Sequence, residues 1–184
     1  IVDDDDAVVP EGVIGHLQVR GASVMSGYLE DAALNAKSFT SDGWFRTGDR
    51  AVVRDGQMTI VGREKDVLII NGANIYPHEI EEVVERVPGV QPSLTVASPT
   101  RPPGAQTDGL VIFFVPAAEA SIEELLRSIR EYVGRAFGLS ANHLVPLAAQ
   151  QVPRTDLGKR GRGELRRRFE AGELAAERRE AERI

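Results

Sequence analysis

From residue 65 onward, short apolar runs alternate with amphipathic helical segments, and this alternation limits the fold more than any other feature. Residues 67–70 and 109–115 are continuous apolar runs of strand length. Helical spacing of apolar residues extends over 121–137, where Ser121 and Glu124 can form a capping box. With further strands expected at 90–97 and 143–149 and helices beginning at Pro77 and near residue 161, the order is β-α-β-β-α-β-loop-α. The sequence therefore predicts a compact α+β unit.

The preceding residues have a different character. Asp55 and Gly56 lie between two Val/Ile-rich runs, and such a dipeptide tolerates the positive φ angles of a tight hairpin turn. Residues 13–20 alternate loosely and predict another strand, and a short helix capped by Asp31 is expected over 31–39. We therefore expect three parts: a β-rich segment (1–64), a small α+β domain (65–169) and a helical or disordered tail (170–184).

Composition excludes several classes of protein. There is no cysteine, which rules out disulfide scaffolds, thiolate metal sites and a cysteine nucleophile. A net charge of −6 makes nucleic-acid binding a poor interpretation. No apolar run approaches the ~18–20 residues of a membrane span, so a cytoplasmic protein without a membrane span is expected. His16, His78 and His143 are scattered without metal-binding spacing, and we expect no metal site.

Three short motifs carry residues suited to nucleotide chemistry. They lie at 43–49 (G-W-F-R-T-G-D), at 62–66 (G-R-E-K-D) with a continuation over 71–81, and at 153–162 (P-R-T-D-L-G-K-R-G-R). Taken singly, each is also compatible with an ordinary turn or a solvated surface loop. The third lacks the spacing of a Walker A phosphate loop.

Together, in this order and at these separations, the motifs resemble the C-terminal portion of the adenylate-forming enzymes. That superfamily contains acyl- and aryl-CoA synthetases, fatty acyl-AMP ligases, the adenylation domains of peptide synthetases, and luciferase. The resemblance covers residues 13 to about 168, and it departs from the family pattern at His16, where a glutamate is usual. It implies that 1–64 are the β-rich C-terminal end of a truncated large adenylating domain and that 65–169 are the small mobile C-terminal domain.

The resemblance also implies a reaction and its site residues. ATP and Mg²⁺ activate a carboxylic acid as an acyl-adenylate, and CoA or the phosphopantetheine of an acyl carrier protein then takes the acyl group. Lys159 is implied as the catalytic cation. Asp49 and Arg63 are implied to hold the ribose of the nucleotide. Gly158 would let the backbone pass close to the nucleotide, and Gly72 would leave room for the pantetheine arm. Lys65 is implied as the hinge of domain alternation.

Some choices stay open at this point. The phosphate-cradling loop, the acyl pocket and the Mg²⁺ ligand of the family are not in this sequence, so we expect the fragment alone to be inactive. The N-I-Y-P sequence at 74–77 resembles acyl-CoA synthetases and acyl-AMP ligases more than peptide synthetases, and this resemblance favours a fatty, aryl or polyketide-starter acid over an amino acid. The alternatives are an amino-acid adenylation domain of a peptide synthetase and a non-catalytic module that docks a carrier protein. The docking surface would be the arginines of the last basic segment: Arg160, Arg162, Arg166, Arg167 and Arg168.

Overall fold

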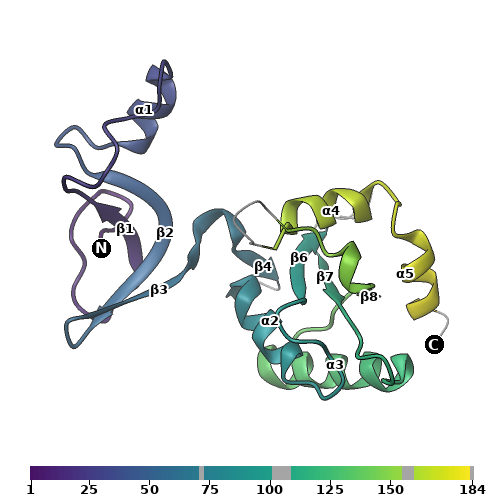
Figure 1. Cartoon of the computed structure of the whole chain (residues 1–184). Helices are drawn as coiled ribbons and strands as arrows, with labels where there is room; N and C mark the ends of the chain where they lie inside the picture. The colour runs from purple at the N-terminus through teal and green to yellow at the C-terminus, as the bar shows by residue number, and fades with distance from the viewer. Residues whose placement is uncertain (71–72, 101–108, 155–159, 183–184) are drawn as a thin grey trace. The chain divides into compact units, whose positions relative to one another are not determined.

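The computed structural model describes residues 1–70, 73–100, 109–154 and 160–182 (Figure 1). The chain divides into two compact units, Ile1–Val67 and Leu68–Ile184. The boundary lies two residues beyond Lys65, in the stretch where the character of the sequence changes.

The N-terminal unit is built on a three-stranded antiparallel sheet of β1 (Gly15–Val19), β2 (Phe45–Arg54) and β3 (Gln57–Arg63), in that spatial order. The helix α1 (Ala32–Ser38) lies between β1 and β2 along the chain, and the side chain of Asp31 accepts the N–H of Leu34 at its start. Asp55 and Gly56 have φ angles of 52° and 71°. The tight β2–β3 hairpin expected at this dipeptide is thus present.

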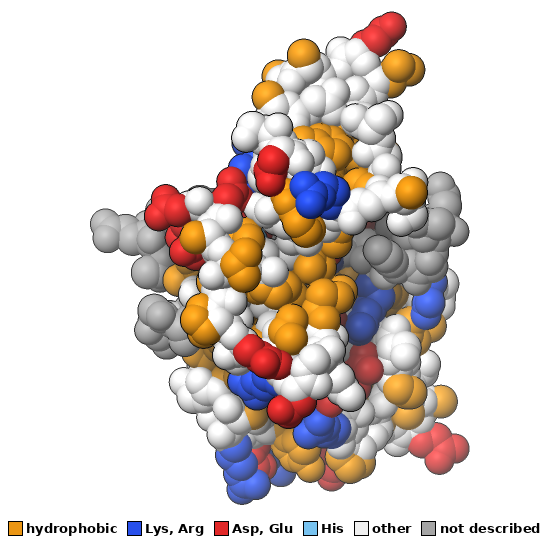
Figure 2. All heavy atoms as spheres, turned by 90° about the vertical axis from the view of Figure 1, so that its left-hand side faces the viewer, with side chains coloured by type: hydrophobic (Ala, Val, Ile, Leu, Met, Phe, Trp, Pro, Cys, Tyr) orange, Lys and Arg blue, Asp and Glu red, His pale blue; other side chains and the backbone are white. Residues whose placement is uncertain are grey.

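The N-terminal unit buries few side chains. Its buried hydrophobic residues are Val2, Leu17, Ala51 and Val52. Large apolar side chains remain in solvent instead, and Figure 2 shows hydrophobic side chains gathered on the face turned to the viewer. They are Val8, Val13, Ile14, Met25, Tyr28, Leu29, Leu34, Met58 and Ile60. Most of the large apolar side chains of this unit are therefore exposed, and few of them form a hydrophobic core.

The C-terminal unit is built around a three-stranded sheet in the order β6-β7-β8. The central strand β7 (Gly109–Phe114) is antiparallel to β6 (Val96–Thr100) and parallel to β8 (His143–Pro146). A separate hairpin is formed by β4 (Leu68–Ile70) and β5 (Ala73–Ile75). The helices are α2 (Pro77–Glu85), α3 (Ile122–Phe137), α4 (Arg162–Glu170) and α5 (Ala175–Glu182).

Alternate residues of β7 enter two different hydrophobic cores, as the period of a strand dictates. Ile112 and its same-face neighbours pack in the core formed with α2 and α3. Phe113 points the other way, into the core that contains Leu165 and Phe169 of α4. Figure 1 shows α2 and α3 on one side of this sheet and α4 on the other. The unit is therefore a layered α+β fold, and the predicted fold class is confirmed.

One expected element differs in the structure, and the C-terminal tail follows the helical one of its two predicted alternatives. The strand expected at 90–97 is instead β6, which begins at Val96, because Ser93 with φ 62° interrupts the extended backbone before it. β6 also includes Pro99, which an edge strand tolerates because its outward side needs no hydrogen bond. The tail expected at 170–184 contains α5, and both Leu174 and Ala181 are buried in the cores of this unit. No helix within the described residues is long and apolar enough to cross a membrane.

Candidate functional site

Asp49 and Arg63 form an ion pair across two neighbouring strands. They are directly opposite each other in the β2–β3 register, and Nε of Arg63 donates to Oδ1 of Asp49 at 3.0 Å. The side chain of Asp49 is 21% exposed and that of Arg63 is 63% exposed. Among the described residues, no donor bonds to Oδ2 of Asp49. One carboxylate oxygen and the Nη groups of the guanidinium thus remain available to a ligand at the surface of the sheet.

The backbone before Asp49 explains why the sequence T-G-D occurs here. Gly48 has a φ of 75°, a conformation that side-chain-bearing residues rarely adopt. The hydroxyl of Thr47 accepts the N–H of Asp49 at 3.0 Å and donates to the carbonyl of Leu17 on β1 at 2.9 Å. The β2–β3 register also shifts just after Arg50, as in a β-bulge. These contacts fix the strand on both sides of the Asp49 carboxylate.

Lys65 lies in a single 3₁₀ turn, Glu64–Asp66, and is exposed. The turn follows β3 directly and precedes the boundary between the two compact units. Its neighbour Glu64 places Oε2 3.6 Å from Nδ1 of His16 on β1. The expected hinge residue thus lies near the end of the N-terminal unit, two residues before its last residue, Val67.

Three of the expected site residues, Gly72, Gly158 and Lys159, lie outside the described residues. The backbone on either side of the last two is described. Arg154 and Arg160 form an antiparallel bridge, and the N–H of Gly161 donates to the carbonyl of Pro153 at 2.7 Å. The two ends of the segment that carries Gly158 and Lys159 are therefore held side by side.

A buried carboxylate lies beside these ends, at the last residue of the motif continuation over 71–81, and the sequence predicted neither its burial nor its ion pairs. Glu81 of α2 is 2% exposed, and its Oε1 accepts from Nη2 of Arg162 at 2.8 Å and from the N–H of Ala97 at 3.0 Å. Arg160 approaches its other oxygen, Oε2, at 3.3 Å. Burial raises the pKa of Glu81 above its usual value, although the positive charges of Arg162 and Arg160 and the N–H of Ala97 oppose that shift.

The basic segment expected to dock a partner carries little uncompensated charge. On α4, Arg166 pairs with Glu170, and Arg167 pairs with both Glu164 and Glu173. Arg168 lies 3.6 Å from Glu173, and Arg160 and Arg162 are engaged with Glu81. The hydrogen bond from Arg167 lowers the pKa of Glu164, as an ion pair would. Each of these arginines therefore faces a carboxylate in the structure, and the docking surface stays a prediction.

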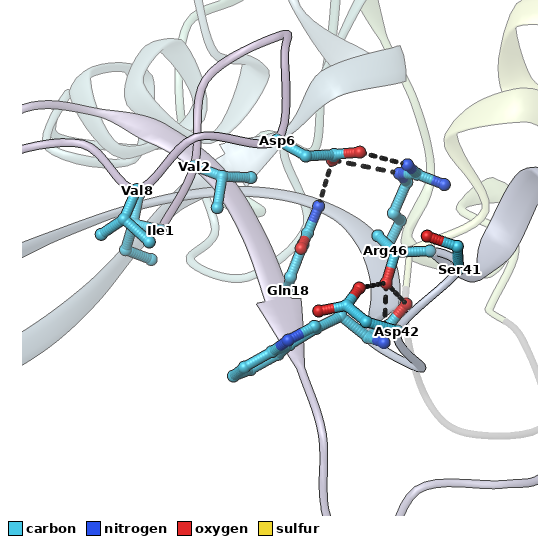
Figure 3. A pocket seen from close by; sticks show the side chains of 10 residues that line it. Ile1, Val2, Asp6, Val8, Gln18, Ser41, Asp42 and Arg46 are labelled. Atoms are coloured by element: carbon cyan, nitrogen blue, oxygen red, sulfur yellow. Dashed lines mark hydrogen bonds and ion pairs between the residues drawn. The ribbon is translucent and has the colours of Figure 1, made fainter.

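A separate pocket of about 390 Å³ lies in the N-terminal unit (Figure 3). Arg46 pairs there with Asp6, and Gln18 donates to the same carboxylate at 2.5 Å. Asp49 and Arg63 do not line this pocket. Arg46 is paired with Asp6, and Asp42 accepts a hydrogen bond from the hydroxyl of Thr40, so the described lining residues offer no unpaired positive charge to a nucleotide. Among the residues with described positions, no three His, Asp or Glu side chains are grouped to hold a metal ion, and we assign no Mg²⁺ ligand here.

The chain is similar to known proteins over nearly its whole length, although no protein-family model matches it. Atromentin synthetase invA1 of Paxillus involutus is 37% identical over 184 residues, which cover 95% of this chain and 19% of that protein. Nonribosomal peptide synthetase pngA of Aspergillus terreus is 36% identical over 172 residues, covering 90% and 18%. The structure of McyG A-PCP complexed with phenylalanyl-adenylate superposes with a TM-score of 0.84 at 37% identity, covering 100% of this chain and 29% of that one. The chain thus spans about a fifth of the length of these curated relatives.

Proposed function

The chain belongs to the adenylate-forming enzymes and matches their C-terminal portion, and we propose that it helps a polypeptide of its relatives' length to activate a carboxylic acid. In the first step a carboxylate oxygen attacks the α-phosphorus of ATP. The bond from that phosphorus to the bridging oxygen breaks, and pyrophosphate leaves. In the second step a thiol sulfur attacks the acyl carbon, AMP leaves with the bonding electron pair, and the thiol proton passes to solvent.

The observation that carries this proposal is the Asp49–Arg63 pair. Oδ2 of Asp49 has no donor among the described residues, and a carboxylate with a free oxygen can accept a hydrogen bond from a ribose hydroxyl. Arg63 is more exposed than Asp49, and its Nη groups can donate to a ribose oxygen while Nε keeps its bond to the carboxylate. The pair would therefore grip the sugar that ATP and the acyl-adenylate share.

Lys159 would supply the cation of the first step. An ammonium on a flexible stem can lie near both the carboxylate and the α-phosphate, where it offsets the repulsion of two anions as they meet. Gly158 beside it would allow a close backbone approach. Lys65, exposed near the end of the N-terminal unit, would be the hinge about which the C-terminal unit turns between the two steps. In the second orientation, Gly72 would leave room for a pantetheine arm.

We propose a carrier-protein phosphopantetheine as the acceptor, with CoA as the alternative. The relatives named above are a nonribosomal peptide synthetase, an atromentin synthetase and a protein holding phenylalanyl-adenylate. These names fit the peptide-synthetase interpretation of the acid at least as well as the fatty, aryl or polyketide-starter acid favoured by the sequence at 74–77. An amino acid therefore belongs in the first panel of substrates.

Exchange of labelled pyrophosphate into ATP tests the proposal, using the complete polypeptide that carries this chain and a panel of amino, keto, aryl and fatty acids. We expect exchange with at least one acid. Lys159→Ala should lower its rate about 100- to 1,000-fold, as the loss of one charge at a developing anion does. The matched control is Lys37→Ala, which removes an exposed lysine on α1 and should leave the rate unchanged. Exchange at the original rate in Lys159→Ala would refute the assignment.

A further inference from the structure

We propose that Glu81 is a positioning residue that anchors the backbone directly following Lys159, so that the lysine is presented to the reaction from a fixed base. The inference rests on the proposed function for its consequence, whereas the anchor itself is a matter of structure. Lys159 is followed by Arg160, Gly161 and Arg162, and this short segment is tied to Glu81 at two of its three residues.

The first step in the argument is the density of contacts at one carboxylate. Arg162 donates to Oε1 of Glu81 through both Nη1 and Nη2, at 3.1 and 2.8 Å. Ala97, within β6, donates its N–H to the same oxygen. Glu81 therefore joins a helix, the central sheet and the segment after Lys159, which begins 79 residues further along the chain.

The second step is the engagement of Arg160, the residue next to Lys159. Besides its contact with Glu81, its Nη1 donates to Oε1 of Glu85 at 3.0 Å and to the carbonyl of Thr95 at 2.5 Å. The side chain is 30% exposed, so most of it is withdrawn from water. Arg160, which is joined to Lys159 by a peptide bond, is thus held by two carboxylates and a backbone carbonyl.

The third step is the close approach at Gly161. A Cβ atom at this position would lie 3.0 Å from Cγ of Pro153 and 3.2 Å from its carbonyl oxygen. A glycine allows this contact, through which the N–H of Gly161 reaches the carbonyl of Pro153. The two ends of the Lys159 segment are thus closed against each other while Glu81 holds one of them.

The fourth step concerns why a charge would be buried here at all. Replacing a buried ion pair by apolar residues is often neutral or stabilising, so such a pair is weak evidence for stability. Burial raises the pKa of Glu81, which means that ionising this group inside the protein is unfavourable in itself. The ion pairs instead fix the position of the arginine relative to the carboxylate, because a planar guanidinium with two donors fits a carboxylate in few orientations. A misplacement of about 1 Å at a catalytic group can cost about 100-fold in rate.

The experiment compares Glu81→Gln with Glu82→Gln in the complete polypeptide. Glu82 is the neighbouring residue on α2, where it pairs with Arg86 in solvent, so its variant controls for the loss of a helix carboxylate. Hydrogen exchange at the amides of Gly161 and Arg162 should become about 10-fold faster in Glu81→Gln and stay unchanged in Glu82→Gln. The kcat for adenylate formation should fall about 10- to 100-fold in Glu81→Gln alone, while KM for ATP changes less than threefold.

A second variant keeps the test decisive if Glu81→Gln does not fold. Arg162→Lys retains the positive charge but loses the fork, and it should show the same faster exchange and lower kcat in weaker form. Unchanged exchange in these variants overturns the anchor, whether or not the protein makes adenylates. Faster exchange with an unchanged kcat overturns the positioning role. Failure of the proposed function would appear separately, as a wild-type polypeptide that makes no adenylate while the exchange result still decides the anchor.

Discussion

The two units of this chain hold their charged motif residues in opposite ways. In the N-terminal unit, Asp49 and Arg63 meet on the surface of one sheet, 14 residues apart, and Arg63 is mostly in solvent. In the C-terminal unit, Glu81 meets Arg162 across 81 residues and is almost fully buried. The first arrangement leaves donors and an acceptor free for a ligand. In the second arrangement the charged groups bind one another, and this is what a group that fixes a local geometry requires.

The cores of the two units differ in the same direction. The C-terminal unit contains two hydrophobic cores on either side of β7, whereas the buried hydrophobic residues of the N-terminal unit are Val2, Leu17, Ala51 and Val52. Met58 and Ile60, on the β3 strand that carries Arg63, are more than half exposed at 53% and 56%. A sheet with so little buried area is expected to depend on another surface for its stability.

The largest expected effect is therefore seen when the units are separated. Residues 68–184 alone should fold and show a cooperative urea transition, because both of their cores are retained. Residues 1–67 alone should show no cooperative transition, because four buried hydrophobic side chains cannot offset the conformational entropy of ordering the chain. Circular dichroism against urea measures both. A sharp transition in residues 1–67 would show that this sheet folds without another surface, and it would contradict the proposed difference in stability between the two units.

A smaller effect comes from making the same substitution in each unit. In the whole chain, Val145→Ala should lower the free energy of unfolding of the C-terminal unit by about 1–2 kcal/mol, because Val145 is fully buried on β8. Val52→Ala removes the same atoms from β2 in the N-terminal unit and should leave that transition unmoved. Urea unfolding followed by hydrogen exchange on β7 separates the two. Equal shifts in both variants would mean that the units unfold together.

How much of this contrast the sequence predicts depends on how local each feature is. The helix α3 was predicted because its cap is local: the hydroxyl of Ser121 accepts the N–H of Glu124, and Gly138 ends the helix with a φ of 65°. The turn at Asp55 and Gly56 was predicted for the same reason. The short strand β5 was not predicted, because three residues give too short a pattern for periodicity to indicate a strand.

The candidate site divides along the same line. The sequence singles out Asp49 and Arg63 by motif, and the hairpin between them is short enough to bring them together predictably. The sequence places Glu81 at the end of the motif continuation over 71–81 and suggests an acidic residue suited to the start of a helix, but it assigns this residue no role in the site. Its burial and its ion pair with Arg162 depend on which face of α2 meets the residues that follow Lys159. The pattern of residues within α2 does not predict this long-range contact. The signal that could have found it is a carboxylate directly after the buried Ile80.

The smallest expected effect concerns His143 on β8, whose imidazole lies against the ring of Phe169 and 3.4 Å from Oε1 of Glu182 on α5. Burial lowers the pKa of His143 below its usual 6.5, and the charge of Arg178 lowers it further, while Glu182 opposes the shift. Since the unfolded chain then binds the proton more readily, the contribution of His143 to stability is present above pH 6.5 and is lost as the pH falls through the lowered pKa.

In residues 68–184, wild-type stability from urea unfolding should therefore decline between pH 7.5 and 5.5 more steeply than that of His143→Gln. His78→Gln, which removes an exposed imidazole on α2, should keep the wild-type slope. Parallel curves for wild type and His143→Gln would contradict this prediction. They would mean that α5 leaves the imidazole of His143 as open to water as that of His78, so that α5 does not pack on the rest of the C-terminal unit.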